Sequence, residues 1–408
     1  MKYLFVHQNF PGQFKYLAPA LSKIDGNQVV GFSMNEYMGS DSLRVINYKV
    51  THANSSEIHP LLKDFESKVI RGEAAYRAAV ALKNEGFYPD VIIAHPSWGE
   101  SLFLKEVWPK AKLGIYCEYF YLSQGGDVGF DSEFSSEKRD IEISIKMKNL
   151  SNMMHFDIAD AGISPTQWQC NTYPDSFKSQ ITVIHDGIDT DLAVPAEDAY
   201  VTINNVIKLN KSDEIITFIN RNLEPYRGYH IFMRALPALL KERPNAHIII
   251  VGGDKVSYGA AAPTGQSWKS IFLNEVIDSL DKSRVHFVGN LSYKNFLKVL
   301  QVSTVHVYLT YPFVLSWSLL EAMSVGCAIV GSKTAPVEEV IEHGVNGILV
   351  DFFDQEGLTQ EIVKLLDNPK LRKELGQSAR RTIMAKYDLK SICLPAQIKW
   401  SSKLLHHP

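Results

Sequence analysis

Short runs of uninterrupted apolar residues alternate with longer amphipathic stretches along the chain. Runs of this kind are typical of strands that are covered on both faces of a parallel sheet. In the first half they predict strands at 3–6, 28–32, 91–94, 112–116, 161–164 and 181–184. Apolar residues at helical spacing predict helices at 14–23 and 64–85. The alternation of the two patterns predicts a doubly wound α/β domain.

The pattern restarts after residue 210. The second half predicts strands at 215–219, 247–252, 285–288, 305–309, 328–331 and 347–350, with helices at 230–241 and 318–325. The segment 185–210 is rich in polar residues, and we interpret it as an interdomain linker. The chain has 408 residues, whereas a single core stops growing at about 250–300 residues. We therefore predict two doubly wound domains.

Composition narrows the class of protein. Hydrophobic residues make up 45% of the chain, charged residues 21%, and the formal net charge is −3. These values disfavour disorder, and a nucleic-acid partner is not expected because there is no strong basic excess. No apolar stretch reaches the about 18 residues of a membrane-spanning helix, and the apolar N-terminus is too short for a signal peptide.

The cysteines point to a reducing compartment. The chain has four, and none forms a C-x-x-C pair: Cys117, Cys170, Cys327 and Cys393. In a chain without a signal peptide, we expect these to be reduced, buried thiols rather than disulfides. The composition is that of a cytosolic enzyme.

Two loops of the first half carry candidate chemistry, because ligands of doubly wound sheets bind outside the carboxyl ends of the strands. Gly12 follows the first strand, where a glycine lets the backbone approach a ligand closely, although a tight turn is an equal alternative. His95 follows the strand 91–94, where an imidazole can bind a hydroxyl or move a proton. A surface loop around Trp98 is the alternative for His95.

In the second half, Arg221 and Arg227 lie in the loop after the strand 215–219. Guanidinium groups suit the oxygens of a diphosphate, and the alternative is a solvated charged loop. Gly252 and Gly253 end the next strand. They permit a base or a phosphate to approach, although such a pair is equally a plain turn.

The segment 311–330 is the strongest candidate. Phe313, Val314, Leu315 and Ser316 form a predicted loop after a strand, and Ser316 or Ser318 can cap the following helix. Glu321 lies among apolar residues of that helix. A buried carboxylate needs a partner, and a ligand diol can provide one. A solvated helix face is the alternative for Glu321.

Taken together, these segments resemble family 4 of the retaining glycosyltransferases, whose members have the GT-B fold. The landmarks occur in the family's order at 183–189, 287–289, 320–326 and 339–350. They read "VIHDGID", "FVG", "LEAMSVG" and "EVIEHGVNGILV". The resemblance implies two Rossmann-like domains that face each other across a cleft. The acceptor would bind to 1–190, joined by a returning C-terminal helix at 386–408, and the donor to 200–385.

The resemblance also implies site residues. Glu321 would hold the donor ribose, Arg227 the donor phosphates, and His95 would lie near the transferred sugar. The remaining positions would surround the donor through loop and backbone contacts: Gly12, Gly252, Gly253, Leu315 and Ser316.

Two positions depart from the family pattern. Phe313 stands where the first Glu of the family's E-x7-E motif usually contacts the transferred sugar, and an apolar ring cannot accept hydroxyl bonds. The Arg of the family's "G-R-L" motif aligns with Asn222, while Arg221 stands one residue earlier. Sugar recognition is therefore expected to differ from the family pattern.

The expected activity is transfer of a sugar from a nucleoside-diphosphate sugar, UDP- or GDP-linked, to a hydroxyl acceptor with retention of configuration. The acceptor would be a glycan, a lipid-linked glycan or a small molecule. No cofactor is expected, and no metal either, because no D-x-D motif follows a strand. Family members commonly lie in the cytoplasm, on the inner face of the membrane.

Two alternatives remain open at this stage. One is a non-catalytic nucleotide- or carbohydrate-binding protein on the same fold, suggested by Phe313. The other is a nucleotide-sugar 2-epimerase, for which the sequence lacks a convincing acidic set.

Overall fold

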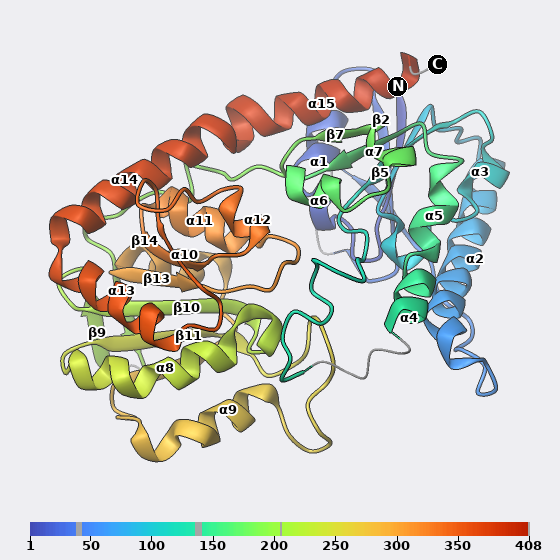
Figure 1. Cartoon of the computed structure of the whole chain (residues 1–408). Coiled ribbons are helices and arrows are strands. Elements are labelled where there is room, and N and C mark those ends of the chain that lie inside the picture. Colours follow the sequence, from blue (N-terminus) through green and yellow to red (C-terminus); the bar gives the residue numbers. More distant parts are fainter. Residues whose placement is uncertain (38–42, 135–140, 205, 407–408) are drawn as a thin grey trace. The chain divides into compact units, whose positions relative to one another are not determined.

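The computed structural model describes residues 1–37, 43–134, 141–204 and 206–406 (Figure 1). The chain divides into two compact units, one made of Met1–Gly187 with Lys390–Pro408 and the other of Ile188–Leu389. The chain therefore passes from unit to unit twice. The two passages are tied together inside the second unit, where Ile188 N donates to Tyr387 O at 2.8 Å and Leu389 N donates to Ile188 O at 2.9 Å.

The first unit is built on a parallel sheet with the order β3-β2-β1-β4-β5-β6-β7. Its strands are β1 (Lys2–Val6), β2 (Gln28–Ser33), β3 (Arg44–Asn47), β4 (Val91–Ala94), β5 (Lys112–Tyr116), β6 (Ala161–Ser164) and β7 (Ile181–Val183). The prediction of a doubly wound sheet is confirmed. β3 was missed because this edge strand is only half-buried and lacks a continuous apolar run.

Helices cover both faces of this sheet. Leu4 and Val6 belong to the core closed by α2 (Lys63–Asn84), and Tyr3 and Phe5 belong to the core closed by α1 (Leu17–Ser22) and α15 (Leu394–Lys403). This double burial explains the unbroken apolar runs. The other helices are α3 (Leu104–Val107), α4 (Ile141–Lys148), α5 (Leu150–Phe156), α6 (Gln167–Asn171) and α7 (Asp175–Lys178). The predicted helix at 14–23 begins later, after a separate turn η1 (Gly12–Phe14).

The second unit contains a parallel sheet with the order β12-β11-β10-β13-β14-β15. Its strands are β10 (Ile215–Asn222), β11 (His247–Gly253), β12 (Val285–Gly289), β13 (Val305–Tyr308), β14 (Ala328–Ser332) and β15 (Ile348–Val350). In chain order this is the arrangement 3-2-1-4-5-6 of the Rossmann fold. The order reverses between β10 and β13, and the predicted strands of this half are confirmed.

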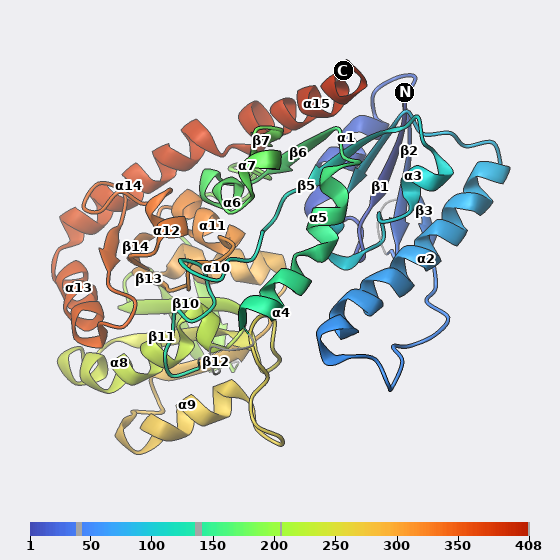
Figure 2. The same ribbon diagram turned by 45° about the vertical axis from the view of Figure 1, so that its right-hand side comes forward.

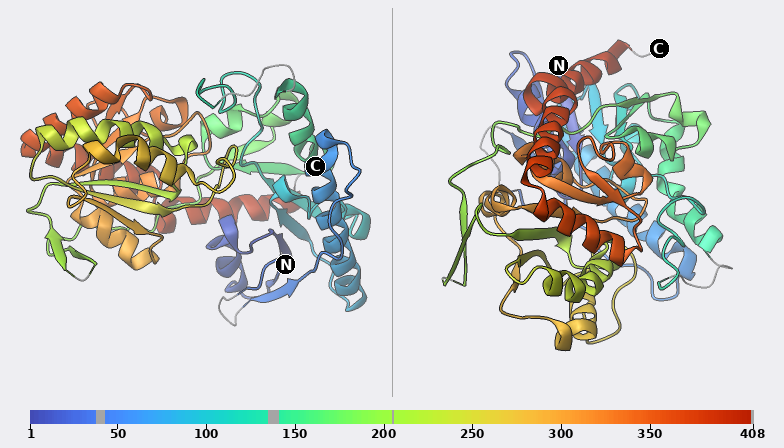
Figure 3. Two further views of the ribbon diagram at one scale, coloured as in Figure 1. Left: turned by 90° about the horizontal axis from the view of Figure 1, so that it is seen from below. Right: turned by 60° about the vertical axis from the view of Figure 1, so that its left-hand side comes forward.

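Two helix layers enclose the second sheet (Figures 2 and 3). In one layer, α8 (Tyr229–Glu242) contacts α9 (Trp268–Val276) and α13 (Gln355–Asp367). In the other, α11 (Trp317–Val325) contacts α10 (Tyr293–Val302) and α14 (Pro369–Lys386). The short helix α12 (Ala335–Glu338) follows β14.

The prediction of a linker over 185–210 is wrong in its second part. β8 (Tyr200–Ile203) and β9 (Ile207–Asn210) pair as antiparallel strands. Ile203 and Leu209 are buried in the core of the second unit, while neighbouring residues face outward. In an antiparallel pair with one solvated face, only every second residue needs to be apolar. The segment of β8 and β9 therefore contains many polar residues, and its composition resembles that of a linker.

All four cysteines are buried and form no disulfide, as expected from the sequence. Among the described residues, no helix combines the length and the apolar character needed to cross a bilayer.

Buried histidines should make the fold sensitive to acid. Burial lowers the pKa of His7 and His306 from 6.5 to about 3, and that of His155 and His185 to about 4. The unfolded chain therefore binds more protons below pH 6.5. The stability that these groups contribute is fully present above that pH and is lost as the pH falls, by up to about 1.4 kcal/mol per pH unit for each group. Urea midpoints at pH 7.5 and pH 5 would measure this loss.

His306→Gln should make the pH dependence shallower, because one of these groups is removed. The exposed His52 provides a control, since His52→Gln should leave the slope unchanged. Equal slopes for the wild type and His306→Gln would contradict the assignment.

Candidate functional site

The carboxyl ends of β10, β11 and β13 carry the candidate residues of the second unit. Arg227 ends the short turn η5 (Pro225–Arg227) after β10, and only 5% of its surface is exposed. Its Nη1 donates to Thr310 Oγ1 at 2.7 Å and to Tyr308 Oη at 3.3 Å. Burial would lower the pKa of Arg227, but Tyr308, Tyr258 and Glu224 together hold this pKa above its usual value. The site therefore contains a permanent, buried positive charge of fixed orientation.

Aromatic rings surround this charge. The guanidinium carbon lies 5.0 Å from the ring centre of Tyr258 and 5.9 Å from that of Phe313. Phe313 is buried and contacts Tyr226 and Tyr258 in T-shaped geometry, with centroid distances of 5.5 and 5.0 Å. Position 313 thus forms part of an apolar wall next to the cation, which is a structural use for the residue that departs from the family pattern.

The loop before α11 is linked to the same charge. Tyr308 Oη, which accepts from Arg227, also accepts from Ser316 N at 3.0 Å. Ser316 Oγ accepts from Ser318 N at 3.3 Å and caps α11, as predicted. The structure thus brings Arg227 and Ser316 together, but the backbone N–H that was expected to meet a phosphate is bonded to Tyr308 here.

The other predicted residues of this segment lie outside the hydrogen bonds that link Arg227, Tyr308 and Ser316. The Leu315 side chain packs into the core, Val314 is half-buried, and Glu321 is buried within α11. A carboxylate in such a position fits the expectation of a polar partner better than the alternative of a solvated helix face.

Gly252 and Gly253 end β11 beside residues of β10. A side chain at Gly253 would meet the amide of Asn222, 2.7 Å from its Oδ1, so the two strand ends are in close contact. Arg221 is exposed to solvent. The structure therefore places Arg227, and not Arg221, inside the polar cluster.

In the first unit, Gly12 lies against the ring of His7, and a side chain at Gly12 would overlap that ring. The backbone of Gly12 is in the left-handed region, with φ of +48°. The glycine is thus required by its contact with His7, which supports the turn interpretation without excluding a nearby ligand.

His7 begins a hydrogen-bonded chain at the carboxyl ends of β1, β4 and β5. Its Nδ1 accepts from Asn9 N at 2.9 Å, which leaves Nε2 to donate to Gln13 Oε1 at 2.8 Å. Gln13 Nε2 then donates to Glu118 Oε1 at 2.9 Å. His95 Nε2 lies 3.6 Å from Glu118 Oε2. The predicted residues Gly12 and His95 are thus brought together at His7, whose ring centre lies 5.4 Å from that of His95.

Glu118 is partly accessible. Its side chain is 28% exposed, while His95 is fully buried. Burial would raise the pKa of Glu118, but the neighbouring His95 and the hydrogen bond from Gln13 hold this pKa below its usual value. The result is an oriented carboxylate that can accept a hydrogen bond from a ligand hydroxyl.

Stacked rings fix His95 in place. Its ring centre lies 4.4 Å from that of Trp98 and 5.3 Å from that of Tyr116. Tyr116 Oη donates to Asp186 Oδ2 at 2.9 Å. His95 therefore lies in a packed environment and not in the open surface loop that was the alternative reading.

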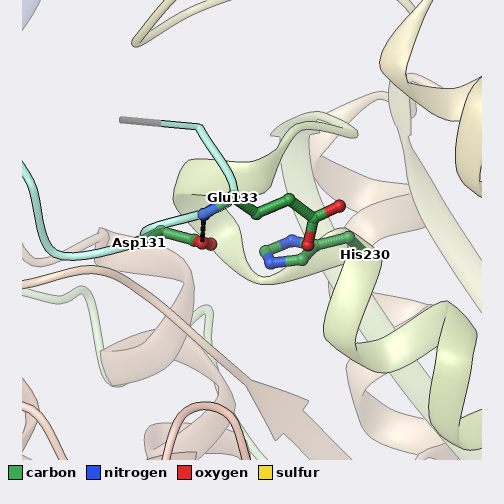
Figure 4. Close-up of side chains that lie close together, drawn as sticks. All are labelled: Asp131, Glu133 and His230. Atoms are coloured by element: carbon green, nitrogen blue, oxygen red, sulfur yellow. Dashed lines mark hydrogen bonds between the residues drawn. The ribbon is translucent and has the colours of Figure 1, made fainter. Parts of the chain in front are cut away.

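The loop after Glu118 is stabilised by its own side chains. Tyr119 Oη donates to Asp127 Oδ1 at 2.9 Å. Glu133 N donates to Asp131 Oδ1 at 3.0 Å, as Figure 4 shows. These bonds stabilise the loop over residues 119–133.

Several residues of these clusters were not predicted. They are Glu224, Tyr258, Tyr308 and Thr310 in the second unit, and His7, Gln13 and Glu118 in the first. Tyr308, Thr310 and Glu118 directly follow or end predicted strands, and this position was the available signal. Tyr258 had none, because it lies in a long loop.

Comparison with known proteins assigns the family. The model "Glycosyl transferase family 4 group" matches residues 25–193, and the model "Glycosyl transferases group 1" matches residues 202–382. The chain thus carries a family 4 glycosyl transferase domain followed by a group 1 glycosyl transferase domain. The resemblance seen in the sequence is thereby confirmed.

The curated relatives match this chain over only part of their length. An uncharacterised glycosyltransferase of Methanocaldococcus jannaschii is 28% identical over 176 residues, which are 43% of this chain and 42% of that protein. The chain thus matches less than half the length of this relative.

Solved structures share the fold. Sucrose-phosphate synthase from Thermosynechococcus elongatus matches with a TM-score of 0.75 at 17% identity and covers 98% of both chains. HepE from Anabaena in complex with UDP matches with a TM-score of 0.69 at 16% identity, over 98% of this chain and 100% of that chain. The chain therefore has the GT-B fold of these glycosyltransferases.

Proposed function

We propose that the chain transfers a sugar from a nucleoside-diphosphate sugar to a hydroxyl group, with retention of configuration and without a metal or other cofactor. The second unit would bind the donor, and the first unit, with its returning helix, would bind the acceptor. The observation that carries the proposal is the buried guanidinium of Arg227, held by Tyr308 and Thr310 at the carboxyl ends of a Rossmann-type sheet.

Ligand chemistry at this position supports a nucleotide donor. A doubly wound sheet binds its ligand outside the carboxyl ends of the strands, where the strand order reverses. Arg227 lies at this point, between β10 and β13. The structural neighbour HepE was solved in complex with UDP and with UDP-glucose. A UDP-sugar is the first donor to test, followed by a GDP-sugar.

Arg227 would act on the leaving group. Negative charge develops on the departing diphosphate, and a fixed cation in a desolvated site stabilises it without reorganisation. In a retaining transfer without a covalent intermediate, the acceptor would attack on the face from which the diphosphate leaves. The leaving phosphate would then accept the proton of the acceptor hydroxyl.

The first unit supplies groups for a hydroxyl. The Glu118 carboxylate is oriented by Gln13 and lies 3.6 Å from His95 Nε2. A carboxylate of this kind can accept a hydrogen bond from a sugar hydroxyl. The acceptor class is therefore an alcohol, on a glycan, a lipid-linked glycan or a small molecule.

A thermal-shift screen tests the donor class. Ligand binding to the folded state stabilises it by about 2.7 kcal/mol at 100 times the dissociation constant. We expect one of UDP, GDP, ADP and CDP to raise the melting temperature more than the others, with UDP as the leading candidate. The matching nucleotide sugars would then be assayed for hydrolysis and for transfer to simple sugars.

The assays have three outcomes, and each supports a different conclusion about the proposed function. A selective shift with sugar release supports the proposal. A selective shift with no release from any donor would instead favour the non-catalytic binding protein. No shift with any nucleotide would reject the donor assignment.

A further inference from the structure

The connection between β11 and α9 is a long loop that lies against the Arg227 site. It runs from Asp254 to Ser267 without a helix or strand. Loops longer than about 12–15 residues without regular structure are uncommon in compact domains and are usually functional. This one is fastened at its far end, where Trp268 Nε1 donates to Ala260 O at 3.0 Å, and at its start, where Lys269 Nζ lies 3.1 Å from Asp254 Oδ1.

The middle of the loop is held by the carboxylate of Glu224. Only 1% of Glu224 is exposed. Ser257 N donates to both carboxylate oxygens, at 3.2 and 3.1 Å, and Tyr258 N donates to Oε2 at 3.1 Å. Asn222 Nδ2 adds a bond to Ser257 Oγ at 2.7 Å. Buried charges are stable only when such donors compensate them, so this contact between the loop and the end of β10 is specific to a carboxylate.

The contact with Glu224 places Tyr258 over the cation. The Tyr258 ring centre lies 5.0 Å from the Arg227 guanidinium carbon. Gly259 follows directly, and a side chain there would come within 2.6 Å of the Tyr226 ring. The loop is thus fixed on both sides of Tyr258. Attraction between a desolvated guanidinium and an aromatic face orients the planar cation.

We propose that Glu224 is a positioning residue for the phosphate-binding arginine. Through the backbone N–H groups of Ser257 and Tyr258, it holds the Tyr258 ring against Arg227 and so sets the orientation in which Arg227 meets a diphosphate. This role rests on the proposed function, because it requires that Arg227 binds the donor phosphates.

Calorimetric titration with a nucleoside diphosphate tests this role. The ligand is whichever of UDP, GDP, ADP and CDP gives the largest thermal shift. Glu224→Gln offers one oxygen in place of two and turns an amide NH2 toward a backbone N–H. We expect this variant to bind the diphosphate about tenfold more weakly, a change within the range of a desolvated cation–π contact.

Glu214→Gln is the matched control. Glu214 precedes the same strand at its opposite end, is partly buried, and pairs with Arg243. This variant also loses a charged contact of β10, but we expect the affinity for the diphosphate to stay within about twofold of the wild type. If both variants lost the same affinity for the diphosphate, the effect of Glu224→Gln would be a general loss of stability, and the proposal would be overturned.

A double-mutant cycle separates positioning from a purely structural role. Tyr258→Leu removes the ring without changing Glu224, and we expect a similar, about tenfold loss. In the Tyr258→Leu background, Glu224→Gln should cause little further loss, because both changes remove the same contact. Additive losses, or normal binding by Tyr258→Leu, would overturn the proposal, and the second result does so even if Glu224→Gln fails to fold.

Failure of the inference is distinguishable from failure of the proposed function. If Arg227→Ala weakens diphosphate binding while Glu224→Gln does not, only the positioning role is wrong. If Arg227→Ala binds every nucleoside diphosphate as tightly as the wild type does, the donor-site assignment itself is wrong.

Discussion

Arg227→Ala should lower the rate of sugar transfer or donor hydrolysis by about 10²-fold or more, which is the loss seen when one transition-state donor is removed from a preorganised site. The expected size follows from the burial of the guanidinium and from its anchoring by Thr310 at 2.7 Å. A charge held in a desolvated site needs no rearrangement when the diphosphate leaves. The measurement is kcat with the nucleotide sugar whose nucleotide gives the thermal shift.

Two further variants sharpen this result. Arg227→Lys keeps the charge but loses the planar fork, and we expect an intermediate loss. Arg234→Ala removes an arginine of the same unit that forms a surface pair with Glu275 at 2.8 Å, and its turnover should stay close to that of the wild type. Unchanged turnover in Arg227→Ala would remove Arg227 from the mechanism.

Gly228→Ala should destabilise the second unit by about 2–5 kcal/mol, from left-handed strain of about 1–2 kcal/mol and from overpacking of about 1–3 kcal/mol. Gly228 joins η5 to α8 with φ of +68°, and a β-carbon at this position would overlap the side chain of Leu309. The residue thus lets the Arg227 turn pack against the end of β13. Hydrogen exchange of β10 and β13 amides would report the loss for this unit specifically.

Gly326→Ala is the control for the backbone contribution alone. Gly326 ends α11 with φ of +84°, but the nearest atoms to an added β-carbon lie 3.7 Å away. We expect a loss of only about 1–2 kcal/mol, because the strain is similar and nothing overlaps. Equal losses in the two variants would show that contact with Leu309 contributes nothing.

Sequence pattern predicted the elements that are buried on both faces. The central strands β1, β4 and β5 are unbroken apolar runs because helices cover both sides of their sheet, and any polar residue there would lose its hydration. The same pattern cannot report an element with one solvated face. β3 and the pair of β8 and β9 were missed or read as a linker for that reason.

Motif spacing predicted where the chemistry lies but not how it is assembled. Arg227 and His95 were found because they lie in loops that follow strands, and the carboxyl ends of parallel strands meet at one edge of a sheet. Their partners are distant in the chain. Gln13 and Glu118 are 105 residues apart, and Glu224 and Tyr258 are 34 residues apart.

The sequence alone thus determined the doubly wound architecture, the family and the edge of each sheet that carries polar groups, because hydrophobic period and local motifs are properties of neighbouring residues. Only the tertiary structure decided that Arg227 is buried while Arg221 is exposed, and that Phe313 forms a wall against the cation. Burial and contact depend on which distant segments pack together. The loop of Tyr258, held by Glu224, is the clearest case, since nothing in either segment indicates the other.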